Sequence, residues 1–483
     1  MAPLLLVLAA AAAPLFWRLD LLPAQQWDEA RTGLNALELL RSHNWLVLTH
    51  RGKPDLWNGK PPLAPWLLAL SFQALGPTEL ALRLPSALAA LATVLLVYRA
   101  GSRWLGSWRA GLLAALILLS SPGYVRLHVA RSGDFDALLT LWTTLGALSW
   151  LAYLVTGRPR HAWAAGGAFA LAVLTKGIAG LLFGPGLLLA TLLTGHGRRL
   201  RKGAPWAALG LVLGTGVAWY TVRELAAPGY LAGVWQYEIG GPASAALEGH
   251  DRPWRWYASM LAETKFAPWL VAALLGAGLG WWLPRGPRLW ALSRGLSAVA
   301  GLFLLVISLV KTKLEWYDAP VYPLLALLAA AGLVATARTM SAHYHRSLPP
   351  VARLAAVLLV AALPYGVLLL QTRRLTNTAW NNASLLYGHH LRAQARQLPH
   401  LQSYLLGDDG VFNDSPEFYM AAMTRQYGHR ITRVSLWAVG WVSPPRVVAT
   451  CGARARKTWE RYYHTRVLFR TDSCETFRLE ARR

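Results

Sequence analysis

The chain has 483 residues, of which 55% are hydrophobic, and a formal net charge of +25. Its mean hydropathy is +0.32. The combination of an apolar composition with a large positive charge indicates a membrane protein with many spans and basic loops. Because basic loops explain the charge, we expect no nucleic acid partner.

Apolar windows of roughly 18 to 22 residues recur from the N-terminus to about residue 371, and each is long enough to cross a bilayer as a helix. We expect about eleven spans. The first window, residues 1–17, could be a cleaved signal peptide. It has no Lys or Arg before Arg18 and no convincing cleavage site, so we interpret it as a retained first helix.

The connecting segments sort by charge into two alternating sets. Basic residues without acids occupy the segments near residues 99–109, 158–160, 198–202, 285–294 and 338–353, while every acid between residues 28 and 318 lies in the other set. The positive-inside rule makes the basic set cytoplasmic and the acidic set extracytoplasmic. The spans themselves are almost free of ionisable residues, which argues against an ion-coupled transporter.

The first outer loop is too long and too amphipathic to be a plain linker. Residues 29–45 place Leu34, Leu37, Leu40 and Trp45 towards one side of a helix, as expected for a helix in the membrane interface, although Arg41 falls near that stripe. Residues 63–75 are apolar but too short to span, so they also belong at the surface. The loop carries the charged residues Asp28, Glu29, Arg31, Asp55 and Lys60.

The composition changes after the last span. The runs "SYLLGDDGVF", "ITRVSLWAV", "PRVVATCG" and "RVLFRTDSCETFRLEAR" predict strands, and "NDSPEFYMAAMTRQYG" predicts a helix with Pro416 in its first turn. We therefore expect a transmembrane catalytic domain over residues 1–372 and a small extracytoplasmic α/β domain over residues 373–483. Outside the cytoplasm Cys451 and Cys474 could form a disulfide, with two free thiols as the alternative.

Five segments, in this order and spacing, resemble the polyprenyl-phosphate-dependent membrane glycosyltransferases of the GT-C class. They are "WDEARTGLNALELLRSHNW", "GKPPLAPWLLALSFQALGPTELALRLPSALAAL", "ARSGDFDALLTLW", "LTKGIAGLLFGPGLL" and "LVKTKLEWYDAPVYPLLALLAA". The chain looks like the branch that includes the lipid A aminoarabinose transferases and bacterial relatives of protein O-mannosyltransferases. The resemblance covers roughly residues 1 to 330.

The resemblance implies transfer of a sugar from a lipid phosphate to an acceptor hydroxyl at the outer face, usually with inversion. Such a displacement needs a carboxylate base for the hydroxyl and cations or hydrogen-bond donors for the departing phosphate. The family's "DE" motif places the catalytic aspartate at Asp28, which is also a good N-cap for the following helix. Its second aspartate matches Asp136 better than Asp134, and Glu29 is a secondary candidate beside Asp28.

Several basic residues are candidates for binding the donor phosphate. Lys60 of "GKPPL" matches a family lysine, and Pro61 and Pro62 fix the turn beside it. Arg31 and Arg131 could bind phosphate oxygens in bidentate fashion, although each could equally be a membrane anchor. The segment with Lys313 and Tyr317 matches family residues near the phosphate. Lys176 is a weaker candidate, since a lysine at a helix end can simply extend to water.

The sequence departs from the aminoarabinose-transferase pattern before Lys60, where Asn58 and Gly59 replace an acid that can hold a metal with a histidine. His250 resembles that histidine but lacks the partner, so we expect it to contact the acceptor and expect no required metal or cofactor. Thr32 replaces an aromatic residue. These changes leave the sugar and the acceptor open.

We therefore expect a transferase of the bacterial cytoplasmic membrane, with its active site outside and an undecaprenyl-phosphate-type donor. An envelope glycolipid is the expected acceptor, with a protein hydroxyl as the alternative. Two alternative hypotheses, from other classes of membrane protein, are a lipid transporter and a non-catalytic scaffold. Neither explains why acids and phosphate-binding cations gather in one set of loops.

Overall fold

The computed structural model describes residues 2–26, 28–126, 128–241, 249–282, 287–343, 349–378, 383–408 and 414–483. By its internal contacts the chain forms two compact units. The first is Met1–Trp17, Pro54–Ala64 and Ser86–Thr372, and the second is Arg18–Lys53, Pro65–Pro85 and Arg373–Arg483. The C-terminal residues thus group with two pieces of the first expected outer loop.

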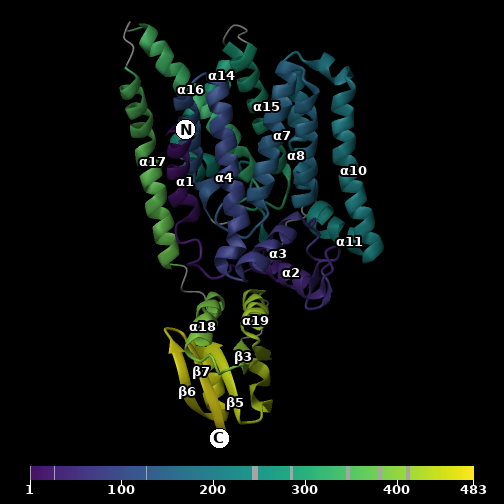
Figure 1. The fold of residues 1–483 in the computed structure, drawn as a ribbon, viewed down its shortest axis with the longest axis vertical. Helices are drawn as coiled ribbons and strands as arrows, with labels where there is room; N and C mark the ends of the chain where they lie inside the picture. The colour runs from purple at the N-terminus through teal and green to yellow at the C-terminus, as the bar shows by residue number, and fades with distance from the viewer. Residues whose placement is uncertain are drawn as a thin grey trace. The chain divides into compact units, whose positions relative to one another are not determined.

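The first unit is a bundle of apolar helices (Figure 1). The larger helices that belong to it wholly or for the most part are α1 (Ala2–Phe16), α4 (Glu79–Trp104), α5 (Trp108–Leu119), α7 (Asp136–Thr156), α8 (Pro159–Lys176), α9 (Gly184–Leu193), α10 (Gly203–Ala226), α14 (Leu270–Trp282), α15 (Pro287–Leu309), α16 (Tyr322–His343) and α17 (Pro350–Thr378). Short elements connect them: α6 (Pro122–Val125), η1 (Gly177–Leu181), η2 (Gly197–Arg201), α11 (Tyr230–Val234), η3 (Trp235–Ile239), α13 (Trp256–Met260), η5 (Leu261–Lys265), η6 (Ala267–Trp269) and η7 (Ala319–Val321).

Six of the described helices are long and apolar enough to cross a membrane, or seven if the pair Trp256–Lys265 and Ala267–Leu279, bent by 91°, is one span. Five shorter apolar helices of 10–17 residues accompany them. A multi-pass helical membrane protein is therefore confirmed, whereas the count of eleven spans stays a prediction.

Local sequence explains where the helices near the site begin and end. α7 ends at Gly157, whose φ of 67° is left-handed and costs a glycine little, and α8 starts directly afterwards with Pro159 in its first turn. This tight connection makes α7 and α8 antiparallel neighbours. Asp136, the first residue of α7, and Lys176, the last residue of α8, consequently lie at the same end of the helix pair.

The second unit contains α2 (Asp28–Ser42), most of α3 (Leu63–Leu75) and the short hairpin of β1 (Thr49–His50) and β2 (Lys53–Pro54). Both expected outer-loop helices are present, but α2 differs from an interfacial helix with one open side, because Glu29 to Leu40 are all buried. It packs against α19 (Asp414–Tyr427), where a Cβ at Gly33 would meet the Phe418 ring at 2.9 Å.

The C-terminal part of the second unit is the expected small α/β domain. Its five strands have the order β4-β3-β5-β7-β6, with β4, β3 and β5 parallel and β5, β7 and β6 antiparallel. They are β3 (Ser403–Asp408), β4 (Arg430–Ser435), β5 (Arg446–Cys451), β6 (Tyr463–Thr471) and β7 (Cys474–Arg482). The helices are α18 (Ala383–Gln397), α19 and α20 (Ala453–Tyr462), and η9 (Leu436–Trp441) follows β4.

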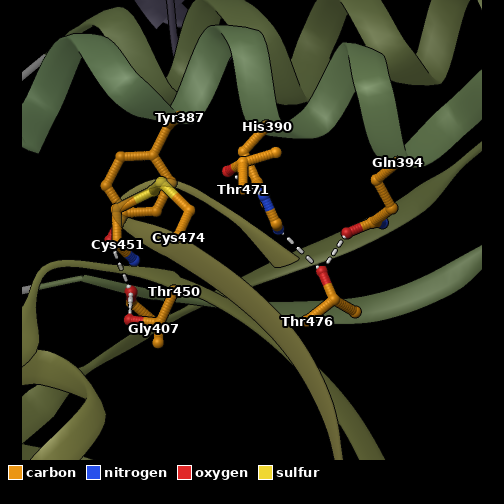
Figure 2. The surroundings of a disulfide bond; sticks show 9 residues. All are labelled: Tyr387, His390, Gln394, Gly407, Thr450, Cys451, Thr471, Cys474 and Thr476. Atoms are coloured by element: carbon orange, nitrogen blue, oxygen red, sulfur yellow. Dashed lines mark hydrogen bonds between the residues drawn. A yellow bond between two sulfur atoms is a disulfide. The ribbon is translucent and has the colours of Figure 1, made fainter. Parts of the chain in front are cut away.

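The two cysteines are joined by a disulfide, so the expectation of a bridge is confirmed (Figure 2). Cys451 ends β5 and Cys474 begins β7, and the two residues are direct partners in the antiparallel register. Both are buried beneath α18, whose Tyr387 hydroxyl donates to the carbonyl of Gly407 at 2.7 Å. The bridge therefore fastens the middle strand of the sheet to its C-terminal hairpin.

Candidate active site

A buried ion pair joins the start of α7 to the end of α8. The Lys176 Nζ donates to both carboxylate oxygens of Asp136, each at 2.8 Å, and the two side chains are 8% and 1% exposed. The same Nζ lies 5.5 Å from the centre of the Tyr317 ring, where a cation is attracted by the ring face. The structure thus brings together three of the predicted site residues.

These three residues line a cavity of about 250 Å³ in the first unit. Glu238 also lines it, and the remaining wall is formed by apolar side chains of α7, α15 and the segment after Lys176, including Leu139, Ile178, Leu182, Phe303, Val306, Ile307 and Val310. A charged pair beside an apolar wall suits an amphiphilic ligand whose polar group can hydrogen-bond to the lysine or the tyrosine.

Lys60 is held by Glu238, with Nζ and a carboxylate oxygen 3.2 Å apart. The ammonium group also lies 5.8 Å from the Trp57 ring centre and 5.3 Å from that of Phe135. Glu238 was not predicted as a site residue from the sequence. Its signal was a lone acid within the aromatic outer segment "WQYEIGG".

The turn that carries Lys60 is fixed from α11. The Tyr230 hydroxyl donates to the Gly59 carbonyl oxygen at 2.7 Å, and burial raises the pKa of this tyrosine to about 12, so it stays a donor. Asn58 is buried in the same turn, and its backbone N–H donates to Asp55 at 3.1 Å. Lys60 is therefore presented from a well-anchored loop.

Lys313 and His250 are adjacent through the backbone rather than through their side chains. The Lys313 N–H donates to the His250 carbonyl at 3.0 Å, and Asp251 and Thr312 form an isolated antiparallel bridge. The Lys313 side chain is buried and donates to the Val310 carbonyl. The contacts of Lys313 and His250 with a substrate stay a prediction.

Asp134 and Arg131 both lie between α6 and α7 but have different surroundings. Asp134 accepts from the Phe135 N–H at 2.7 Å and lies 3.3 Å from the His128 ring, which stacks on Trp316 at 3.9 Å. Arg131 donates to the Pro14 and Trp17 carbonyls, so its guanidinium holds the end of α1. The phosphate-binding role expected for Arg131 stays a prediction beside this structural one.

His128 was missed from the sequence and is unusual in its backbone. Its φ of 71° is rare for a residue with a side chain. Such backbone conformations persist only where surrounding contacts hold them, and they cluster at functional sites. The stacked Trp316 and the Asp134 carboxylate are those contacts here, so this histidine belongs with the candidate residues.

In the second unit, Asp28 is the first residue of α2 and is partly exposed. Its neighbour Glu29 is buried and accepts from Arg83 through both carboxylate oxygens, at 2.8 and 2.9 Å. Arg83 also donates to the Leu19, Leu22 and Pro23 carbonyls. Glu29 therefore orders the chain that leads into Asp28. The sequence signal for Arg83 was an arginine near the start of an apolar helix whose other two arginines lie near its end.

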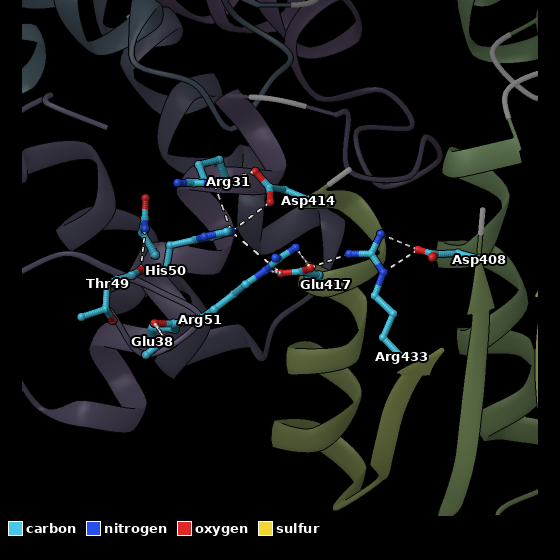
Figure 3. Close-up of polar contacts among 11 residues, drawn as sticks. Arg31, Glu38, Thr49, His50, Arg51, Asp408, Asp414, Glu417 and Arg433 are labelled. Atoms are coloured by element: carbon cyan, nitrogen blue, oxygen red, sulfur yellow. Dashed lines mark hydrogen bonds and ion pairs between the residues drawn. The ribbon is translucent and has the colours of Figure 1, made fainter. Parts of the chain in front are cut away.

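Arg31 lies in a cluster of charged residues of the second unit (Figure 3). It donates to Asp414 at 3.2 Å and faces the His50 ring nitrogen at 3.1 Å. Glu417 binds both Arg51 and Arg433, and the Arg433 guanidinium reaches Asp408 at 2.6 Å. Glu417 raises the pKa of Arg51, which keeps that side chain charged.

One group in this cluster has the composition of a metal site. A ligand atom of His50, of Asp414 and of Glu417 all lie within 4.8 Å of one another. However, Asp414 is already paired with Arg31, and Glu417 with two arginines, so an arginine would have to move before a cation could bind. We interpret the cluster as an ion-pair network that joins β1 to the start of α19.

Comparison with known proteins agrees with the fold and with the family resemblance. Residues 59–220 match the family model of the dolichyl-phosphate-mannose-protein mannosyltransferases. An undecaprenyl phosphate-alpha-4-amino-4-deoxy-L-arabinose arabinosyl transferase of Aeromonas salmonicida is 30% identical over 336 residues, 67% of this chain and 59% of that protein. An uncharacterized protein of Aquifex aeolicus is 29% identical over 296 residues, 61% of this chain and 57% of that protein.

Solved structures with the same fold cover almost the whole chain. ArnT from Cupriavidus metallidurans bound to undecaprenyl phosphate has a TM-score of 0.71 at 18% identity, covering 98% of this chain and 97% of its own. The Archaeoglobus fulgidus oligosaccharyltransferase has a TM-score of 0.55 at 13% identity, covering 98% of this chain and 74% of its own.

These comparisons confirm the resemblance drawn from the five motifs. In sequence and in fold, the chain is similar to the polyprenyl-phosphate-dependent glycosyltransferases of the GT-C class. Among them, the arabinosyl transferases that act with undecaprenyl phosphate recur in the sequence matches, and ArnT matches in structure. The chain spans between 56% and 59% of the length of these curated relatives.

Proposed function

We propose that this protein is a glycosyltransferase that moves a sugar from a polyprenyl-phosphate donor to a hydroxyl or phosphate of an envelope glycolipid, with inversion. The observation that carries the proposal is the buried Asp136–Lys176 pair, which lines a cavity with Tyr317. Its setting combines an apolar wall with fixed cationic and phenolic donors, as a lipid phosphate requires.

The proposed chemistry is a single displacement at the anomeric carbon. With a hydroxyl acceptor, Asp28 accepts the hydroxyl proton as the oxygen forms its bond to the anomeric carbon, while the bond from that carbon to the phosphate oxygen breaks. The electron pair leaves with the polyprenyl phosphate, whose growing charge is stabilised by cations such as Lys60 and Lys313 and by the Tyr317 hydroxyl. No step is assigned to a metal or other cofactor.

Asp136 and Lys176 have complementary roles in this proposal. The carboxylate fixes the ammonium group in one position, because a buried lysine without a partner would be costly. A phosphate entering the cavity would then meet a cation that is already oriented. Glu238 has the same relation to Lys60, and it would have to yield part of its contact when the phosphate binds.

An extracytoplasmic active site of the bacterial cytoplasmic membrane follows from the charge pattern of the loops. The acids of the expected outer set include Asp28, Asp136 and Glu238, whereas the opposite connections are basic. A polyprenyl-phosphate sugar displayed at the outer leaflet would reach such a site.

The proposal has two forms, which differ in the acceptor that receives the sugar. The arabinosyl transferases among the relatives favour an envelope glycolipid such as lipid A. The matching family model is named for protein mannosyltransferases, which favours a protein hydroxyl as the second candidate. Radiolabelled product formed in native membranes separates the two, since a glycolipid extracts into organic solvent and a glycoprotein does not.

The experiment that tests the proposal is mass spectrometry of the lipids that co-purify with the protein from its native host. We expect Asp28→Asn to retain a polyprenyl-phosphate sugar, because the donor can bind but the acceptor cannot be deprotonated. The wild-type protein should retain more of the sugar-free polyprenyl phosphate. Asp20→Asn, which removes an exposed carboxylate that precedes α2 in the same loop, serves as the matched control.

Two results would overturn the proposal. One is that neither protein carries a polyprenyl phosphate and neither binds added polyprenyl-phosphate sugar. The other is that Asp28→Asn and Asp20→Asn turn over the identified donor as fast as wild type, which would remove Asp28 from the chemistry.

A further inference from the structure

A second cavity of the first unit lies towards the end of α8 that is opposite to Lys176. Its volume is about 400 Å³. It is lined by Ala162, Ala165, Gly166 and Phe169 from the first half of α8, by Trp150 from the end of α7, by α9, and by the start of α10. The cavity is therefore separate from the one that contains the Asp136–Lys176 pair.

The wall of this cavity is apolar. The indole N–H of Trp150 donates to the Thr191 hydroxyl at 2.9 Å, and that of Trp206 donates to the Leu200 carbonyl at 2.8 Å. Both indole N–H groups therefore have hydrogen-bond acceptors in the protein and need none from a ligand in the cavity. Apolar cavities of this kind stay dry and bind apolar molecules. Leu188, Trp206 and Leu209 line it and are exposed, so the cavity is open at the surface of the helix bundle.

A basic segment borders the same cavity. Leu200 of η2 forms part of the wall, and the residues around it are Arg198, Arg199, Arg201 and Lys202. η2 is fixed to the end of α7, because the Tyr153 hydroxyl donates to the Arg199 carbonyl at 3.1 Å and the Arg199 guanidinium lies against Gly157. The cations are thus held beside the opening rather than on a free loop.

The positive charge of this segment is not balanced by nearby acids. The sequence has no Asp or Glu between Asp136 and Glu224. Within the described ranges, no ion pair involves any of the four cations. An apolar cavity that opens beside unbalanced cations at the end of a transmembrane bundle is complementary to a lipid with an anionic headgroup.

We propose that this cavity and the segment Gly197–Lys202 form a binding site for an anionic phospholipid of the adjoining leaflet. One acyl chain lies against Phe169, Leu187 and Trp206 in the cavity. The phosphate lies at the level of Arg198 and Arg201, whose guanidinium groups donate to its oxygens. The site lies at the opposite end of α8 from the proposed donor phosphate site, and it stands whether or not the proposed transfer reaction is correct.

Native mass spectrometry of the full chain in detergent, titrated with phosphatidylglycerol or phosphatidylcholine, tests the site. We expect Arg198→Gln with Arg201→Gln to weaken the first phosphatidylglycerol at least about tenfold and to leave phosphatidylcholine unchanged. Removal of two equally exposed charges from α20, Arg454→Gln with Lys457→Gln, is the matched control and should leave both lipids unchanged.

The cavity is tested separately by filling it. Gly184 lines the cavity and a Cβ there meets nothing within 4 Å, so Gly184→Leu puts a side chain into the space without a backbone clash. Gly167→Leu on α8 is equally unobstructed but does not line the cavity. We expect the first change to reduce phosphatidylglycerol binding at least about fivefold, in line with loss of buried acyl methylenes, and the second to have no effect.

Three outcomes would overturn the proposal. Equal binding of the two lipids to wild type would indicate only a non-specific lipid shell. Equal weakening by the arginine variant and by the α20 variant would indicate a general charge effect. Displacement of phosphatidylglycerol by an added polyprenyl phosphate at equal concentration would assign the cavity to the donor lipid instead.

Discussion

At the scale of single residues, the pairing of Asp136 with Lys176 determines how much substitutions in the candidate site lower the free energy of unfolding. Both groups are buried, so removal of either leaves an uncompensated charge. We expect Asp136→Asn or Lys176→Met to cost about 3–5 kcal/mol of unfolding free energy each. The double variant should cost less than the sum, because it removes both charges together.

Thermal unfolding of the four proteins in the same detergent measures this coupling. Thr175→Val, which lies next to Lys176 but carries no charge, controls for general loss of packing in α8. Additive effects of the two substitutions, within about 0.5 kcal/mol, would show that the pair does not act as a unit.

His390 gives the C-terminal part of the chain a pH-dependent stability. Burial lowers the pKa of this ring from 6.5 to about 4, while its nitrogens lie 2.9 and 2.8 Å from the Thr471 and Thr476 hydroxyls. Between pH 6.5 and 4 the unfolded chain binds a proton here and the folded chain does not. The free energy of unfolding therefore falls as the pH falls, by up to about 3 kcal/mol.

Denaturant unfolding of the full chain, followed by near-UV circular dichroism at pH 7 and pH 4.5, checks this expectation. His390→Asn should flatten the pH dependence, whereas substitution of the exposed His400 by Asn should leave it as in wild type. An unchanged slope in His390→Asn would assign the acid sensitivity to other groups.

Sequence alone could nominate single residues of the site but not their partners. Asp136, Lys60 and Tyr317 were recognised from motifs, and Lys176 was ranked last among the cations although it forms the buried pair. Its partner lies 40 positions away, and only the antiparallel packing of α7 and α8 brings the two together. Glu238 escaped notice for the same reason, since its pairing with Lys60 follows no periodicity.

At the scale of elements, the disulfide secures the sheet of the C-terminal part. It closes a loop between residues separated by 23 positions. A crosslink of this span restricts the unfolded chain and is worth about 3 kcal/mol. We expect Cys451→Ser with Cys474→Ser to lower the unfolding midpoint of the C-terminal sheet, and a reducing agent to have the same effect on wild type.

Hydrogen exchange of β5 and β7 measures this change, because those strands carry the bridge. Helix α8, which belongs to the other unit, is the internal reference and should keep its exchange rates. Equal loss of protection in α8 would show that the bridge stabilises the whole chain rather than the sheet.

Elements were more predictable than contacts, because they depend on local patterns. All four β-prone runs contain strands, and the predicted helix begins at Asp414 with Pro416 in its first turn. The amphipathic pattern also predicted correctly that α2 is a helix, but the prediction that α2 lies in the membrane interface with one open side was wrong, because Glu29 to Leu40 are all buried. A stripe shows which side of a helix is apolar, whereas the packing of α19 on α2 depends on residues almost 400 positions away.

At the scale of the whole molecule, the sorting of charges predicts how the chain crosses the membrane. The basic segment Gly197–Lys202 and the tail after residue 373 fall on opposite sides under the positive-inside rule. The general class of helical membrane protein was predictable from composition. The number of spans was less so, because several apolar helices are too short to be assigned by length.

Cysteine labelling in intact cells tests this orientation directly. The two native cysteines are joined in a disulfide, so they do not react with a maleimide. We expect Lys457→Cys in α20 to react with a membrane-impermeant maleimide in intact cells. Gly203→Cys, at the exposed start of α10, should react only after the membrane is opened. The reverse pattern would place the basic connections outside, and with them it would move the candidate active site to the cytoplasmic face, where a donor displayed in the outer leaflet could not reach it.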